Sequence, residues 1–378
     1  MKLTARQLNR ATLERQRLLK REPMSVVQAV RDVCGLQAQS PASPYLALWN
    51  RVAQFKAAEL DRAYASYAVV KATLMRMTLH AVAAEDYPAF HRAMVDLMRR
   101  ARVFDRRFTA GGIAVAEAEA VIPELVAYAP AGRSNAEFEA AITERGLPGK
   151  HVWFALRRYG PFWHAPTDGP WSFNDRPSYM AAHSTPFDGD REAALPMLLR
   201  RYLEAFGPAS AADFNQFTML YQPPIKAALA ALADELVTHA GPDGKLLYDV
   251  ATATIPPDDT PAPPRLLPMW DNVLLAYRDR SRITPDSYRT TISRMNGDTL
   301  PTVLVDGHVA GVWRPAPDGR SGIEITAFER LDKATWAALE GEAQNLVAFL
   351  ADRQPDVYRR YAHWWEKLPA GAVRIVGG

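Results

Sequence analysis

The chain has 378 residues, a length that accommodates two or three domains. Hydrophobic residues make up 48% and charged residues 23%, which excludes a disordered chain and predicts a globular fold with a buried core. The formal net charge is +3, and nine lysines leave 36 arginines among the 45 basic residues. Arginine suits phosphates and base edges because its forked donors are always charged, although a GC-rich genome accounts for the same bias.

The residue types rule out several kinds of site. The one cysteine, Cys34, excludes an internal disulfide framework and a cysteine-rich zinc site. No histidine is paired with a second histidine or a carboxylate at a metal-ligand spacing, so we expect neither a metal nor a cofactor. The GxSxG, Walker A and GxGxxG motifs are absent. No apolar run reaches the roughly 18–20 residues of a membrane helix, and residues 1–6 lack the apolar core of a signal peptide. We therefore expect a cytoplasmic protein with no membrane association.

The first 86 residues predict one helical unit that ends in strands. Apolar spacing favours a helix over residues 4–21, and Ser25 can cap a second helix that Gly35 ends. Ser43 and Pro44 begin a third helix, which we expect to run to about residue 53. The alternating apolar residues that follow, from 69 to 83, indicate a pair of strands. Three helices followed by strands are typical of a winged helix-turn-helix.

The same order is expected twice more. In residues 87–189 we expect four helices and then a wing rich in Trp, Pro and Gly, over residues 87–108, 114–128, 134–145, 151–159 and 160–179. In residues 190–255 we expect three helices and a strand pair, over residues 190–206, 211–217, 223–236 and 237–253. Each round predicts one further winged-helix unit.

A proline-rich boundary separates these units from a β-rich region. Six prolines lie between Pro256 and Pro268, which indicates a rigid linker. Strand-like runs follow over residues 266–277, 302–305, 309–312 and 323–328. Asp306 and Gly307 between two of them are a strong hairpin signal. We expect a β unit over residues 256–330, then a helix over 334–350 and an aromatic tail in residues 331–378.

The segment from Gly35 to Pro41 is the most unusual part of the sequence. Ser40 precedes a proline and is disfavoured in a helix, so the segment is expected to be extended. In an extended chain Gln37 and Gln39 face the same way, and their two carboxamides could fix one water or one sugar. The alternative is a helix connection whose glutamines cap backbone groups.

Several runs together resemble the AlkZ/YcaQ family of bacterial DNA glycosylases. They cover nearly the whole chain, and it is their combination that is specific. The runs are GLQAQSP at 35–41, PYLALW at 44–49, LMRMTLH at 74–80, LLPMWDNVLL at 266–275, DRSR at 279–282 and VLVDGHVAGVWR at 303–314.

The resemblance implies a fold and a catalytic motif. The fold would be α+β and mainly α, with three tandem winged helix-turn-helix modules in a C shape and a small C-terminal β-barrel. The motif would be Gln-x-Gln, formed by Gln37 and Gln39, as in the AlkZ-like branch; the YcaQ-like branch has Gln-x-Asp. One position departs from the family, because Met77 stands where glycine is common.

The resemblance implies a monofunctional DNA glycosylase that hydrolyses the N-glycosidic bond of cationic alkylpurines, in DNA repair or in self-resistance to a genotoxic natural product. Its substrates would include N7-alkylguanine, bulky adducts and interstrand crosslinks. The chemistry agrees, because glutamine is neither a useful general base for the attacking water nor an acid that can protonate a poor leaving group. A purine alkylated on a ring nitrogen is already cationic and departs as a neutral base.

Several cationic residues are candidates for binding DNA. Arg76 and His80 lie beside the glutamine pair in the expected strand region, Arg280 and Arg282 belong to a basic cluster, and Arg314 ends the last matching run. Phosphate contacts are required before any specificity. The alternatives are salt-bridged surfaces for the arginines and a polar contact within the wing for His80. The expected partner is double-stranded DNA with alkylated purines, bound by a monomer.

Two other functions remain open at this stage. One is a winged-helix transcription regulator without catalysis, although no effector domain or dimerisation coiled coil is visible. The other is a structural DNA-binding scaffold in a biosynthetic cluster.

Overall fold

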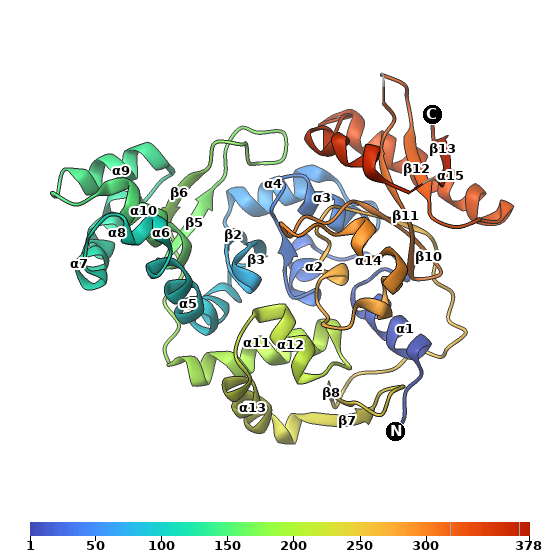
Figure 1. Ribbon diagram of the computed structural model, residues 1–378, viewed down its shortest axis with the longest axis horizontal. Coiled ribbons are helices and arrows are strands. Elements are labelled where there is room, and N and C mark those ends of the chain that lie inside the picture. Colours follow the sequence, from blue (N-terminus) through green and yellow to red (C-terminus); the bar gives the residue numbers. More distant parts are fainter. Residues whose placement is uncertain (318, 370) are drawn as a thin grey trace.

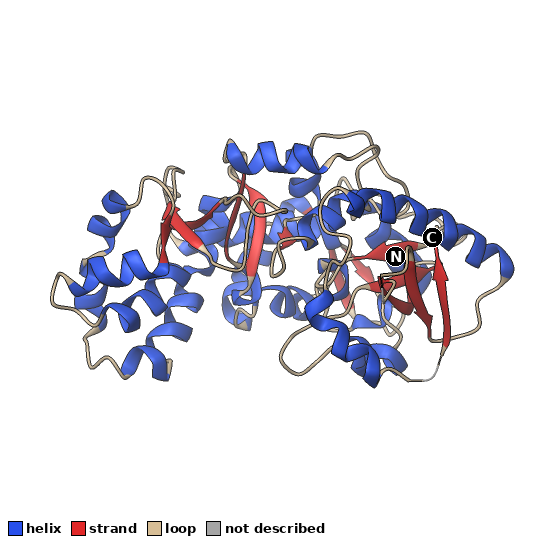
Figure 2. Ribbon diagram, turned by 90° about the horizontal axis from the view of Figure 1, so that it is seen from above, coloured by secondary structure: helices blue, strands red, loops and turns tan. Residues whose placement is uncertain are grey.

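The computed structural model describes residues 1–317, 319–369 and 371–378. The molecule is elongated, and its two larger sheets follow one another along the long axis with helices around them (Figures 1 and 2). One end is formed by the helices α7 (Val115–Ala120) to α10 (Gly149–Tyr159), and the other by the C-terminal sheet (Figure 1). The fold is therefore a mixture of α and β elements.

The first 86 residues form four helices, three strands and a short 3-10 turn. Helix α1 begins at a capping box between Thr4 and Gln7 and ends at Arg15, six residues before the expected end. A fourth helix, α4, and the short strand β1 were not expected. The elements are α1 (Ala5–Arg15), α2 (Val26–Asp32), β1 (Leu36–Gln37), α3 (Ser43–Trp49), α4 (Ala57–Ala65), β2 (Val69–Thr73), η1 (Met75–Met77) and β3 (Leu79–Ala83).

Two helices expected in the next region are each divided. Asp105 caps a new helix after α5, and Pro123 stands in the first turn of α8, so α7 ends before it. The other elements follow the expected order. They are α5 (Tyr87–Val103), α6 (Arg106–Thr109), α7 (Val115–Ala120), α8 (Ile122–Tyr128), β4 (Arg133–Ser134), α9 (Asn135–Thr143), α10 (Gly149–Tyr159), β5 (Phe162–Ala165) and β6 (Ser178–Ala181).

The third region matches its expected order of helices and then a strand pair. Helix α12 begins at a capping box between Ser210 and Asp213. The elements are α11 (Arg191–Phe206), α12 (Ala211–Thr218), α13 (Gln222–Ala231), η2 (Ala233–Glu235), β7 (Leu236–Ala240) and β8 (Leu246–Val250).

The expected β-barrel is wrong. In the described residues the C-terminal strands form an open sheet in the order β13-β12-β11-β10-β9, with β9 and β13 at its edges. Strand β9 has three residues because Pro268 and a left-handed Trp270 end it, and the strand expected to reach residue 277 stops there. Helix α15 packs against both edge strands, so a helix, and not strand pairing, spans the gap. The elements are β9 (Arg265–Leu267), η3 (Asn272–Leu274), η4 (Arg280–Arg282), α14 (Asp286–Ile292), β10 (Thr302–Val305), β11 (His308–Pro315), β12 (Ile323–Ala327), α15 (Lys333–Ala351), η5 (Arg359–Lys367) and β13 (Ala372–Val376).

The larger sheet joins the first two regions and positions the glutamine motif. Its strand order is β1-β3-β2-β5-β6-β4, so β1 is an edge strand next to β3. Gln37 is paired with His80, and Leu36 with Ala81. Since successive side chains alternate between the faces of a sheet, Gln37 and His80 share one face, while Leu36 and Ala81 share the other.

A buried ion pair brings the segment after β9 against the first region. Both Arg51 nitrogens Nη1 and Nη2 lie 2.8 Å from the carboxylate oxygens of Asp271, and both side chains are 1% exposed. A bidentate pair of this kind fixes the direction of the chain as well as its position. The residue after Asp271, Asn272, is thereby held beside β1.

Candidate active site

Gln37 is buried, and its carboxamide has a fixed orientation. The side chain is 5% exposed, and its Oε1 accepts a hydrogen bond of 2.7 Å from Nη2 of Arg76. A guanidinium only donates hydrogen bonds, so the oxygen of Gln37 must face Arg76. The amide nitrogen of Gln37 is therefore the end that remains for another partner.

Asn272 completes the support of this carboxamide from the far end of the chain. Its Oδ1 accepts a second bond of 2.7 Å from Nη2 of Arg76, and its Nδ2 donates to the carbonyl of Gly35 at 2.9 Å. Three separate segments thus meet around one guanidinium. Sequence reasoning did not select Asn272 as a site residue, and the only signal was its place in the run from 266 to 275.

Unusual backbone conformations gather at this point. Cys34, Arg76, Met77 and Trp270 are non-glycine residues with φ between 54° and 59°. Gly35 has φ of 82°, and a Cβ there would lie 2.8 Å from a methyl carbon of Val82. Residues held in the left-handed region are strained and often mark functional sites.

His80 is a neutral member of the cluster. Its Nδ1 lies 3.1 Å from the carbonyl of Thr78, and its Nε2 lies 3.4 Å from Nη2 of Arg76. Nδ1 therefore carries the proton and donates it to Thr78, while Nε2 faces a donor. Burial and the charge of Arg76 lower the pKa of His80 to about 3. The histidine is consequently not a cation for DNA at neutral pH.

Arg76 retains donors for a further partner. Burial and the nearby charge of Arg280 lower the pKa of Arg76 to about 9, so the guanidinium stays charged at neutral pH. Its Nη1 makes only a long contact of 3.5 Å, to the carbonyl of Phe217. Arg280 donates a similarly weak bond of 3.4 Å to Oγ of Ser293. In the described part of the chain neither arginine has a carboxylate partner, and two neighbouring cations without an acid suit an anion.

Gln39 lies at the surface, two residues beyond Gln37. The intervening Ala38 is buried and continues the pairing with β3, since its N–H donates to the carbonyl of Leu79 at 2.7 Å. The chain bends at Gln39, whose side chain is exposed. Leu36 and Ala38 are buried; the shared direction of the two glutamines stays a prediction.

The other two predicted DNA contacts have partners within the fold. Nη1 of Arg282 donates to the carbonyl of Pro208 at 3.0 Å, and the guanidinium lies 4.2 Å from the ring centroid of Tyr277. Arg314 forms an ion pair of 2.7 Å with Glu324. The structure brings Arg76 and His80 to Gln37, but it does not bring Arg282 or Arg314 into contact with that cluster.

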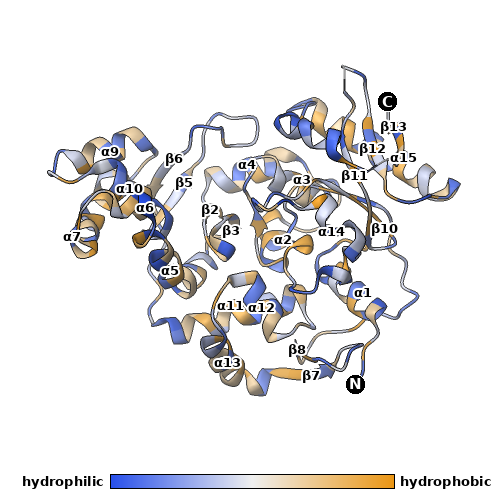
Figure 3. Cartoon of the chain, in the orientation of Figure 1, coloured by the Kyte–Doolittle hydropathy of each residue, from blue (hydrophilic) through white to orange (hydrophobic). Residues whose placement is uncertain are grey.

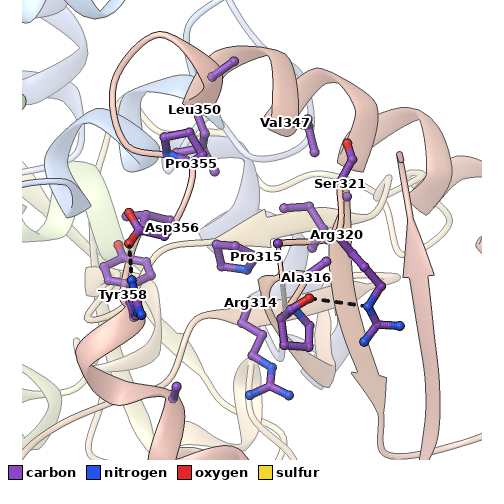
Figure 4. Close-up of a pocket in the computed structure, with 18 of the residues that line it drawn as sticks. Arg314, Pro315, Ala316, Arg320, Ser321, Val347, Leu350, Pro355, Asp356 and Tyr358 are labelled. Atoms are coloured by element: carbon purple, nitrogen blue, oxygen red, sulfur yellow. Dashed lines mark hydrogen bonds and ion pairs between the residues drawn. The ribbon is translucent and has the colours of Figure 1, made fainter.

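Arg314 lines a cavity of about 730 Å³ in the C-terminal unit. Its walls are the strands on either side of the β11–β12 turn, α15 and the segment leading into η5 (Figure 4). Val347 and Leu350 project into it from α15, opposite Pro315 and Ala316 (Figure 4). None of the residues at Gln37 lines this cavity, so it is not the site of the motif.

Five arginines lie at the end of α5 and in α6, at positions 99, 100, 102, 106 and 107, and several of them are paired with acids. Arg99 forms an ion pair of 2.6 Å with Glu119, and Arg107 one of 2.8 Å with Asp105. Figure 3 shows this end of α5 and α6 as a hydrophilic segment. These ion pairs make this segment a salt-bridged part of the surface.

The described residues hold no group of three His, Cys, Asp or Glu side chains that could bind a metal ion. Within the same residues, no helix is both long enough and apolar enough to cross a membrane. The one cysteine, Cys34, is buried and free, and burial raises the pKa of its thiol far above the usual value.

A family model described as "DNA glycosylase AlkZ-like" matches residues 30–349. The match covers most of the chain, and the chain belongs to the AlkZ-like DNA glycosylases, a family of hydrolases acting on N-glycosyl bonds.

A sequence comparison and a structure comparison each match the chain to a protein from Streptomyces sahachiroi. An interstrand DNA cross-link repair glycosylase is 27% identical over 167 residues, which are 41% of this chain and 43% of the relative. This match therefore spans less than half of the relative's length. The solved structure of the DNA glycosylase AlkZ has a TM-score of 0.80 and 20% identity, covering 94% of this chain and 98% of that chain. The two chains share their fold.

Proposed function

We propose that the protein is a monofunctional DNA glycosylase that hydrolyses the N-glycosidic bond of cationic alkylpurines such as N7-alkylguanine. It would act as a monomer on double-stranded DNA in the cytoplasm. The observation that carries the proposal is the Gln37 carboxamide, fixed by Arg76 and Asn272. Asp32, five residues before Gln37, is paired with Arg17, and Asp271, the neighbour of Asn272, is paired with Arg51.

A site without a free carboxylate restricts the substrate. Uracil, hypoxanthine and undamaged guanine leave as anions unless an acid protonates them. N7-alkylguanine carries a positive charge and leaves as a neutral base, so it needs only an oriented water and an oriented sugar. Amides supply orientation without acid–base strength.

The two glutamines would have different tasks. The oxygen of Gln37 is occupied by Arg76, so Gln37 offers its N–H groups to an acceptor on the substrate. The exposed Gln39 has a free carboxamide oxygen that can accept from a water and hold it near C1′. In this scheme Gln37 positions the nucleotide, and Gln39 positions the nucleophile.

Arg76 and Arg280 would bind a DNA phosphate. A phosphodiester supplies the anion that both guanidinium groups lack, and Nη1 of Arg76 can reach it while Nη2 still holds Gln37. Charge neutralisation has a second benefit, because an unpaired Arg76 would repel a cationic lesion. Phosphate binding and lesion binding are thereby coupled.

We also propose that the helix–strand order corresponds to three tandem winged-helix modules in a C shape, over residues 1–86, 87–189 and 190–255, followed by the β unit at 256–330 and the segment 331–378. The separate β7–β8 pair supports a distinct third module, while the sheet of β1 to β6 joins the first two. An open channel between modules would admit bulky adducts. The cross-link repair named for the relative supports crosslinks as substrates, with DNA repair or self-resistance as the role.

A panel of duplexes tests this function. Wild-type protein should release N7-methylguanine and unhook an N7-linked crosslink, and it should leave uracil and hypoxanthine in place. Gln37→Ala and Gln39→Ala should each slow single-turnover release of N7-methylguanine by roughly 100-fold, with nearly unchanged DNA affinity and melting temperature. Release of uracil at a comparable rate would refute the leaving-group argument. DNA binding with no release of any base would favour the transcription regulator.

A further inference from the structure

A tight turn after α14 presents a methionine entirely to solvent. The N–H of Gly297 donates to the carbonyl of Arg294 at 3.0 Å, and Ser293 pairs with Thr299 at the base of the turn. Met295 occupies the first corner, and its side chain is fully exposed. The left-handed φ of 87° at Gly297 closes the turn. The methionine therefore projects from an ordered support.

This turn is attached to the glutamine site on two sides. Nε1 of the buried Trp270 donates to the carbonyl of Gly297 at 3.2 Å, and Trp270 stands two residues before Asn272. Arg280, whose charge is close enough to lower the pKa of Arg76, donates to Ser293 at the base of the turn. The same elements that hold Gln37 thus also hold Met295.

The surroundings of the methionine are cationic. Arg289 is exposed, and its charge acts on Arg280. The guanidinium of Arg294 lies 5.2 Å from the ring of Trp364. The turn carries one acid, Asp298, which accepts a bond of 2.8 Å from Asn296 and remains an anion, so the three arginines outnumber it. A single exposed methionine is ordinary on a protein surface, but an apolar tip framed by arginines beside a catalytic motif is the arrangement that opens stacked DNA.

We propose that Met295 is a wedge that enters the base stack of double-stranded DNA next to the lesion, while the arginines around it hold the phosphates. Opening one base step costs a few kcal/mol, which an inserted apolar side chain offsets by replacing the lost stacking contacts. The glycosidic bond then becomes accessible to Gln37 and Gln39. This inference rests on the proposed glycosylase function.

The test compares Met295→Ala with Met197→Ala, which truncates a half-exposed methionine on α11. Each variant is assayed on N7-methylguanine opposite cytosine and opposite an abasic site, where the base pair is already lost. Met295→Ala should slow release roughly 10-fold opposite cytosine and less than about threefold opposite the abasic site. Met197→Ala should match wild type on both duplexes, and Met295→Leu should retain most activity.

A second readout does not depend on catalysis. With 2-aminopurine beside the lesion, wild-type protein should raise the fluorescence on binding, and Met295→Ala should not. Equal release by Met295→Ala and wild type opposite cytosine, or equal fluorescence, would overturn the wedge. Absence of release by wild-type protein would refute the glycosylase proposal instead, and the fluorescence would still decide whether Met295 inserts.

Discussion

Two cations on opposite faces of the larger sheet have contrasting surroundings. Lys71 on β2 pairs with Ala81, the neighbour of His80 on β3, so Lys71 and the Gln37 site lie on opposite faces. Arg76, on the Gln37 face, donates to two amide oxygens at 2.7 Å. In the described residues Lys71 has neither a hydrogen bond nor an ion pair; its Nζ lies 4.3 Å from the ring centroid of Phe173.

The two groups respond differently to their burial. The pKa of Lys71 falls to about 7 because burial penalises the ammonium, and the side chain is only 5% exposed. The pKa of Arg76 falls to about 9, which still leaves it charged at neutral pH. A lysine can escape its penalty by losing a proton, whereas an arginine cannot do so at neutral pH and must be given acceptors. The oriented amides around Arg76 are therefore the part of the sheet that is organised for a charged partner.

The largest expected effect comes from removing the cation on the Gln37 face. Arg76→Ala should slow single-turnover release of N7-methylguanine by roughly 100-fold, because Gln37 loses the donor that orients it. Asn272→Ala, which leaves Arg76 with one amide acceptor, should slow release by roughly 10-fold. Lys71→Met, on the other face, should stay within about twofold of wild type. Similar losses for Arg76→Ala and Lys71→Met would show that the Gln37 face is no more important for catalysis than the opposite face.

The salt dependence of DNA affinity tests whether Arg280, whose guanidinium makes only a weak bond to Ser293, contacts a phosphate. Arg280→Ala should reduce the slope of log affinity against log salt by roughly 0.9, the loss of one phosphate contact. Arg282→Ala is the matched control, because its guanidinium is bound to Pro208 and stacked on Tyr277. Its slope should equal that of wild type, with lower stability. If the two variants exchanged these outcomes, Arg282 would be the phosphate contact.

A smaller effect concerns the stability of the protein as a function of pH. The folded pKa of Lys71 lies below the ordinary value of 10.5, so the unfolded chain binds one more proton between about pH 7 and 10.5. The loss of stability caused by the buried ammonium of Lys71 is complete below pH 7, and it disappears as the pH rises to 10.5. Lys71→Met should raise the free energy of unfolding by roughly 2–4 kcal/mol at pH 6.5 and by less at pH 9.5.

Denaturant unfolding at the two pH values measures this difference. Lys56→Met, at an exposed lysine before α4, is the control and should leave the free energy of unfolding nearly unchanged at both. A pH-independent gain for Lys71→Met would mean that packing, and not the buried amine, limits stability.

Local signals predicted much of the fold. Ser25 caps the helix that it was expected to begin, and Asp306 and Gly307 connect β10 to β11. Contacts between residues that lie far apart in the sequence could not be predicted from one sequence. Asn272 meets Gly35 across 237 positions, and no local pattern indicates that contact.

The same limit applies to the strands at the edges. The three-residue β9 and the terminal β13 are held by neighbours and by α15, so their residues carry little pattern of their own. The barrel was implied by the resemblance and not by these strands, and in the described residues β9 and β13 stay unpaired with each other at the two edges. Lys71 is a further case, because nothing in an alternating strand pattern distinguishes a lysine that faces solvent from one that faces Phe173.

The central claim is that Arg76 occupies the oxygen of Gln37, so Gln37 acts as a donor and Gln39 holds the water. Single-turnover release of N7-methylguanine by Gln37→Glu and Gln39→Glu, measured side by side, tests it most directly. In Gln37→Glu the new carboxylate would pair with Arg76 and have no N–H to offer, so release should fall by roughly 100-fold without loss of melting temperature. In Gln39→Glu the new carboxylate would still accept from a water and could activate it, so release should stay within about 10-fold of wild type. Equal losses in the two variants, or a greater loss in Gln39→Glu, would contradict the account.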